Sequence, residues 1–257
     1  MTASRWHTSA ADWFNWVWEN DSSLMELLVP SIFSNFETSE EDDTVADEDI
    51  FGDLNIPDTL PILPLRGVVV YPQTAVPLTV GQPRSIRLVD DILSGDKLVG
   101  LVASKKPELE EPDLENLYRV GTVATVHRLL RAPDGTIRLL VQGIARFRLG
   151  MMVETEPYLK AEIELAPDIE EEGLQVDALA RNAREQFSQI AEMIPSFPEE
   201  LIASISSLVD PLETAYTVAN FQRMDLKDAQ EMLTIDSTEG KLRKLVGLLV
   251  RENQLLQ

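Results

Sequence analysis

The prevailing hydrophobic period of this chain changes from strand-like to helical close to Pro167, and that change limits the fold more than any other feature. Before it, apolar residues come in short runs or alternate with charged residues, as at 158–165, a pattern typical of strands. From Asp168 onward they recur at helical spacing. Strands followed by helices are typical of an α+β protein. At 257 residues, the chain is long enough for one or two domains with a buried core.

The first part is expected to hold about six strands and one or two helices. Prolines interrupt the first two strands, which predicts that both lie at a sheet edge. The sequence Ala132-Pro-Asp-Gly135 is a turn signal and predicts a hairpin between the strands on either side. Pro83 and Gly95 mark the start and end of a helix. Strands are expected at 60–65, 75–80, 97–103, 118–130, 136–141 and 158–165.

The second part is expected to be a bundle of helices, over residues 171–194 and 199–208 and then from Asp210, Asp225 and Asp236 onward. Asp210 precedes Pro211, which predicts an N-cap followed by a proline in the first turn. Residues 236–239 resemble a capping box with a carboxylate in the place of the usual Ser or Thr, so Asp236 is predicted to begin the last helix. The three glutamates at 170–172 are read as a helix N-terminus, where negative charge is favourable.

Residues 1–58 are predicted to be a largely disordered acidic leader, before a β domain at 59–166 and a helical subdomain at 167–257. All four tryptophans lie in this leader, and a short helix would place Trp13, Trp16 and Val17 on one face. Residues 37–49 hold too little apolar surface to offset the entropy of ordering. The tryptophan segment is interpreted as a motif that docks on a partner or on its own domain, or else as a loose amphipathic tail.

The net charge of −22 argues against two classes of partner. Residues 1–60 contain fourteen acidic residues against one basic residue, Arg5, and the remainder is also acidic. An acidic surface repels phosphate, so no nucleic acid and no membrane is expected as a partner. The sequence has neither a signal peptide nor an apolar run near the ~18 residues that span a bilayer, so a cytoplasmic protein is expected.

Motifs of the kind that carry out catalysis are missing from the sequence. There is no cysteine, no phosphate-binding glycine loop and no zinc-protease or nucleophile-elbow motif. The two histidines lie apart, and His127 is interpreted as a surface residue of a strand. Ser104 and Lys105 are neighbours on a strand end and so point to opposite faces, which disfavours a Ser–Lys nucleophile. We therefore expect no enzyme, no metal and no cofactor, and a function in binding.

The candidate binding surface is the segment from Arg66 to Pro72. If its valines alternate, Val69 and Tyr71 point outward beside Pro72, and exposed apolar patches mark interaction sites. Further along the chain, Leu114, Leu117 and Tyr118 are expected to extend this surface. Arg146 and Arg148 share one face of a strand and are expected to pair with carboxylates.

Residues 60–72, Leu-Pro-Ile-Leu-Pro-Leu-Arg-Gly-Val-Val-Val-Tyr-Pro, resemble the opening of the N-terminal domain of Lon, the ATP-dependent protease. Similar matches follow in the order of that family at 76–81, 117–124, 133–136 and 140–143. The resemblance implies a PUA-like pseudo-barrel followed by a helical bundle. It also implies a domain that recognises unfolded or damaged polypeptides and helps to assemble a hexamer. The ATPase and Ser–Lys protease sites of the family belong to later domains.

The leading hypothesis is a non-catalytic module that binds exposed hydrophobic segments of unfolded or damaged proteins, with a Lon-type protease as a possible partner. One alternative is a scaffold that joins specific folded partners, using the tryptophan motif. Another is that the chain is the N-terminal fragment of a full Lon protease. RNA binding would follow only from analogy with PUA domains, and the acidic charge disfavours it.

Overall fold

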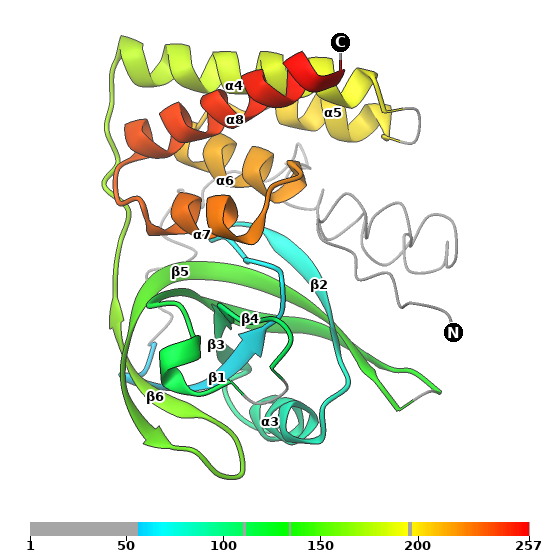
Figure 1. Cartoon of the computed structure of the whole chain (residues 1–257), viewed down its shortest axis with the longest axis vertical. Coiled ribbons are helices and arrows are strands. Elements are labelled where there is room, and N and C mark those ends of the chain that lie inside the picture. Colours follow the sequence, from blue (N-terminus) through cyan, green and yellow to red (C-terminus); the bar gives the residue numbers. More distant parts are fainter. Residues whose placement is uncertain (1–55, 110–111, 134, 195–196, 257) are drawn as a thin grey trace, which may run out of the picture.

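The computed structural model describes residues 56–109, 112–133, 135–194 and 197–256. A strongly curved sheet forms one end of the molecule, and a stack of helices covers its other end (Figure 1). The α+β class is therefore confirmed. The strands are β1 (Thr59–Leu65), β2 (Ala75–Val80), β3 (Leu98–Ala103), β4 (Val120–Arg131), β5 (Ile137–Glu154) and β6 (Lys160–Leu165).

The sheet closes on itself through β5. Its order is β2-β5-β4-β3-β1-β6, and β5 also pairs with β6. The strand is long enough for this because its first part pairs with β2 and β4 and its last part with β6. The predicted hairpin is confirmed as β4–β5, but β5 extends well beyond the expected end at Val141.

The edge position expected for the first strand is wrong. β1 lies between β3, with which it is parallel, and β6, with which it is antiparallel. Each neighbour pairs with a different half of β1, and Ile62 N donates to Leu159 O on the β6 side while Leu65 O accepts on the β3 side. Because successive residues of a strand point to opposite edges, Pro61 and Pro64 each face away from the strand that pairs with their half, and neither removes a donor from its ladder. β2 does lie at the end of the strand order, as expected.

Two apolar clusters fill the barrel. One includes Leu88, Val89 and Ile92 of helix α3 (Pro83–Leu93), which lies against the bottom of the barrel in Figure 1. The other is centred on Phe147 and Leu117, both fully buried. A short 3₁₀ turn, η1 (Leu114–Asn116), precedes Leu117. His127 is exposed on β4, as expected.

Five helices form the second part: α4 (Leu174–Glu192), α5 (Glu199–Ser207), α6 (Pro211–Phe221), α7 (Leu226–Thr234) and α8 (Thr238–Leu256). The long helices α4 and α8 lie side by side, and Asn253 of α8 donates to the carbonyl of Gln186 at 3.1 Å. Asp210 and Asp225 cap α6 and α7 as predicted, since their side chains accept from Glu213 N and Asp228 N.

The predicted start of the last helix is displaced by one residue. Ser237 Oγ accepts from Gly240 N at 2.9 Å and caps α8. Asp236, expected in that role, instead faces Arg146 of the barrel. A buried arginine competes for this carboxylate, and the neighbouring hydroxyl takes over as the cap.

Candidate functional site

The segment that was expected to expose an apolar surface is buried in the structure. Val69, Tyr71 and Pro72 are all buried, with Tyr71 only 2% exposed. Val69 and Tyr71 do point away from the barrel interior, but they point into the helical bundle and belong to its core cluster. The prediction of an exposed patch is therefore wrong, because the helices of the same chain cover it.

Tyr71 ties this segment to two helices. Its hydroxyl donates to the carbonyl of Ala229 on α7 at 3.0 Å, and its ring stacks on Tyr216 of α6 with 5.7 Å between centroids. Burial raises the pKa of Tyr71 well above its ordinary value. The segment is thus a structural junction between barrel and bundle.

The other predicted contact residues lie at different depths. Leu117 is fully buried in the barrel, so its expected exposure is also wrong. Leu114 and Tyr118 are partly buried and keep some surface. Tyr118 packs against the barrel cluster, as Leu114 does, and also against the bundle cluster that contains Tyr71.

A buried network of charges lies at the same junction. Arg146 of β5 is 1% exposed, and its guanidinium lies 2.8 Å from Asp168 Oδ1 and 3.0 Å from Asp236 Oδ1. Arg146 also donates to the carbonyls of Leu233 and Pro167, at 3.0 and 3.1 Å. These bonds join the barrel to the segment before α4, to the end of α7 and to the turn between α7 and α8.

Two further groups complete the network around Asp168. Lys241 Nζ of α8 lies 3.0 Å from Asp168 Oδ1, and the hydroxyl of Tyr216 donates to Asp168 Oδ2 at 2.6 Å. Burial lowers the pKa of Lys241 to about 8, although Asp168 acts in the opposite direction. Arg148 reaches the other side of Asp236 at 3.5 Å, so the expected pairing of both arginines with carboxylates is confirmed.

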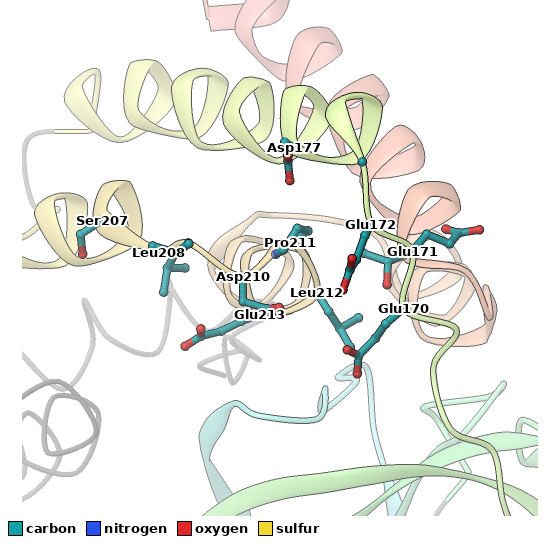
Figure 2. A pocket seen from close by; sticks show the side chains of 13 residues that line it. Glu170, Glu171, Glu172, Asp177, Ser207, Leu208, Asp210, Pro211, Leu212 and Glu213 are labelled. Atoms are coloured by element: carbon teal, nitrogen blue, oxygen red, sulfur yellow. The ribbon is translucent and has the colours of Figure 1, made fainter. Parts of the chain in front are cut away.

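An open cleft of about 840 Å³ lies between the segment before α4 and the turn from α5 to α6. Figure 2 shows Glu170, Glu171 and Glu172 on one side, with Asp177 projecting from α4. Asp210 and Glu213 lie at the start of α6, beside the apolar side chains of Leu208 and Leu212. None of the thirteen lining residues is basic.

Two of these carboxylates have structural partners. Glu171 accepts from Glu239 N at 2.8 Å and so caps α8, and Asp210 accepts from Glu213 N at 2.6 Å. The side chain of Glu213 is half-buried, and burial together with the charge of Asp210 raises its pKa. The cleft therefore concentrates negative charge.

This cleft was not predicted from the sequence. The sequence predicts that the glutamates at 170–172 begin a helix, which in fact begins at Leu174, and it predicts Asp210 only as a cap. The available signal is the presence of acidic residues at the starts of two helices, α4 and α6. Only the packing of α4 beside α6 brings them together.

Three expectations concern features outside this site. Trp13, Trp16 and Val17 lie outside the described residues. In the parts of the chain that the structure describes, no cluster of three or more His, Asp or Glu side chains has a metal-binding arrangement. Across the same residues, no helix has the length and apolar character needed to cross a membrane.

Comparison with known proteins shows the family. The model of the ATP-dependent protease La (LON) substrate-binding domain matches residues 59–251, which span both the barrel and the bundle. Lon protease 1 of Herpetosiphon aurantiacus is 46% identical over 206 residues, and these cover 79% of this chain and 25% of that protein. Lon protease of Escherichia coli K12 is 36% identical over 200 residues, covering 77% and 25%. The chain thus matches about a quarter of the length of each of these relatives.

Solved structures share the fold. The N-terminal domain of Lon protease from the Mycobacterium avium complex aligns with a TM-score of 0.62 at 18% identity, covering 75% of this chain and 98% of that one. The Lon N-terminal domain protein from Xanthomonas campestris aligns with a TM-score of 0.53, also at 18% identity, covering 74% and 97%. With the family match across barrel and bundle, these findings show that the chain belongs to the family of Lon substrate-binding domains.

Proposed function

We propose that this chain is a non-catalytic module of ATP-dependent proteolysis that binds exposed hydrophobic segments of unfolded or damaged proteins. The observation that carries the proposal is the match of residues 59–251 to a substrate-binding domain. In this proposal the module works in the cytoplasm, and a Lon-type ATPase and protease, in the same protein or as a partner, unfolds and cleaves what the module has bound.

Burial limits which of the proposed residues a client polypeptide could contact. A client cannot reach Val69 or Tyr71 unless the barrel and bundle separate, and it cannot reach Leu117 unless the barrel itself opens, since all three are buried. Of the residues proposed for client contact, Leu114 and Tyr118 retain surface. We keep these two as candidate contacts, and Trp13, Trp16 and Val17 as a candidate partner motif.

Binding of the full chain to one labelled protein, held either permanently unfolded or folded, tests the proposal by fluorescence anisotropy. We expect preference for the unfolded form, with modest affinity, because ordering a flexible client costs entropy. Tyr118→Ser should weaken binding while Arg119→Ser, an exposed neighbour, should not. Equal binding to both forms, or to neither, would overturn the proposal.

A further inference from the structure

The hairpin that joins β4 to β5 is the basic part of an acidic chain. Residues 117–153, which hold β4 and most of β5, contain six arginines and one acidic residue, Asp134, although the whole chain has a net charge of −22. The outer end of this hairpin, residues 127–138, holds three of the arginines and is the basic arm of the molecule. It projects away from the barrel at the lower right of Figure 1.

One face of the basic arm points away from the barrel and carries two arginines beside a leucine. Leu129 of β4 packs against the barrel cluster that includes α3, so its sequence neighbours Arg128 and Leu130 point outward. Arg138 of β5 lies directly opposite Leu130 and therefore shares this outer face. Leu130 is 47% exposed. An exposed apolar side chain among positive charges suits an acidic segment that also carries apolar residues.

The described part of the chain does not neutralise this outer face completely. Arg131, on the opposite face of β4, pairs with Asp90 of α3. Arg128 is exposed and forms no ion pair with any residue that the structure describes. A carboxylate from outside the described residues can therefore approach Arg128 without displacing another one.

The chain itself contains a segment of the complementary chemistry, outside the described residues. Residues 37–54 hold nine acidic residues and no basic residue, together with the apolar side chains of Ile50, Phe51 and Leu54. Asp43 precedes the start of β1 by sixteen residues, which span up to about 50 Å when extended. A folded unit of about 200 residues has a radius of gyration of about 17 Å. This length of chain therefore allows the segment to reach the basic arm.

We propose that residues 37–54, the acidic segment, dock on the outer face of the basic arm of the same chain. Carboxylates of the segment pair with Arg128 and Arg138, and an apolar residue packs on Leu130. Each exposed ion pair is weak, but a tethered segment has an effective concentration of about 1 mM, so several weak contacts suffice. Nucleic acid, another polyanion that a basic surface can bind, is disfavoured by the net charge of −22. This inference goes beyond the proposed function, because it gives the leader a role that requires no client.

A nitroxide on the acidic segment tests the contact in the full chain by NMR. The chain has no cysteine, so Thr44→Cys provides a single labelling site. We expect the nitroxide to broaden the amide signals of Leu130, Arg138 and Thr79, which pairs with Arg138 on β2. The signal of Leu245 in α8 should not change. The broadening should decrease as salt is raised, because exposed charges are screened.

Variants locate the contact. Arg128→Gln/Arg138→Gln should lower the broadening at Thr79 by about threefold or more. Arg128→Gln alone, a change at an exposed position, should lower it by a smaller factor. Arg181→Gln/Arg251→Gln removes the same charge from exposed positions of α4 and α8 and should leave the broadening unchanged.

Competition identifies the chemistry of the docked segment. An excess of a synthetic peptide of residues 37–54 should displace the tethered segment and reduce the broadening. The same peptide with Gln and Asn in place of its acidic residues should not. Competition of equal strength by both peptides would contradict docking through charge.

Three other results would overturn the proposal. The first is that the nitroxide broadens no signal of the basic arm, or that both double variants reduce the broadening equally. The second is that a nitroxide-labelled chain broadens the arm signals of a separate, nitroxide-free chain as strongly as its own, in which case the occupant is the segment of a second copy. The third is that a DNA duplex shifts the arm signals while the nitroxide does not broaden them, in which case the arm binds nucleic acid.

Discussion

Arg146 is the largest fully buried side chain among the described residues, and it carries a charge. Its ion pairs with Asp168 and Asp236 connect a strand to the segment before α4 and to the turn between α7 and α8. Removing one partner of a buried pair leaves the other charge uncompensated, which costs about 3–5 kcal/mol. We expect Arg146→Met to lower the free energy of unfolding by about that amount in urea denaturation. Arg148→Met, on the same strand but with a half-exposed side chain, should cost less than about 1 kcal/mol. A loss below about 1 kcal/mol for Arg146→Met as well would contradict a stabilising role of the buried network.

Lys241 gives the same network a dependence on pH. Its pKa falls from the ordinary 10.5 to about 8 in the folded chain, chiefly through burial. Between these values the unfolded chain binds more protons at this group than the folded chain, so the free energy of unfolding rises with pH. Above pH 10 the raised pKa values of Tyr71 and Tyr216 act in the opposite direction. We therefore expect stability, measured by urea denaturation, to rise from pH 8 to about pH 10. Lys241→Met should remove that rise. If the free energy of unfolding of this variant still rises from pH 8 to about pH 10, another group causes the rise.

Among the elements, β5 depends on a glycine where the Tyr71 segment crosses it. A Cβ on Gly143 would lie 2.1 Å from the carbonyl oxygen of Tyr71, which is backbone and cannot rotate away. Gly143→Ala should displace the segment and cost at least about 1–3 kcal/mol in urea denaturation. A Cβ on Gly247 of α8 would have no other atom within 4 Å. Gly247→Ala should therefore stabilise the helix by up to about 1 kcal/mol. A neutral Gly143→Ala would mean that the segment is not held against β5.

Local sequence patterns predict the helices and strands well, but they predict poorly which other parts of the chain each one contacts. The helix from Pro83 and the caps Asp210 and Asp225 follow from residues within one turn, and all three are confirmed. The inner position of β1, the capping of α8 by Glu171 and the pairing of Asp236 depend on contacts across the chain. A strand's own residues do not say what will pair with it, and a carboxylate's position in sequence does not say which donor it meets.

For the whole molecule, the most informative disagreement concerns the Tyr71 segment. The sequence predicts the outward-facing apolar residues of this segment and, with them, an exposed binding patch. The alternation holds, but the outward face is the side on which the bundle packs. An apolar outer face of a barrel needs a partner, and pattern alone cannot say whether that partner is a ligand or a later part of the same chain.

The shared cluster predicts that barrel and bundle unfold together. Val69, Tyr71, Ala103 and Val120 belong to the core of the bundle although they lie in the barrel part of the chain. We expect amide exchange at Val99 in β3 and at Leu245 in α8 to report the same free energy of unfolding. Tyr71→Ala removes the ring that stacks on Tyr216 and the bond to Ala229, so it should separate the two values. Val99→Ala, a truncation within the barrel cluster alone, should lower both values equally. Two different free energies in the unmodified chain would mean that barrel and bundle open independently, and the buried Tyr71 surface would then be accessible to a client.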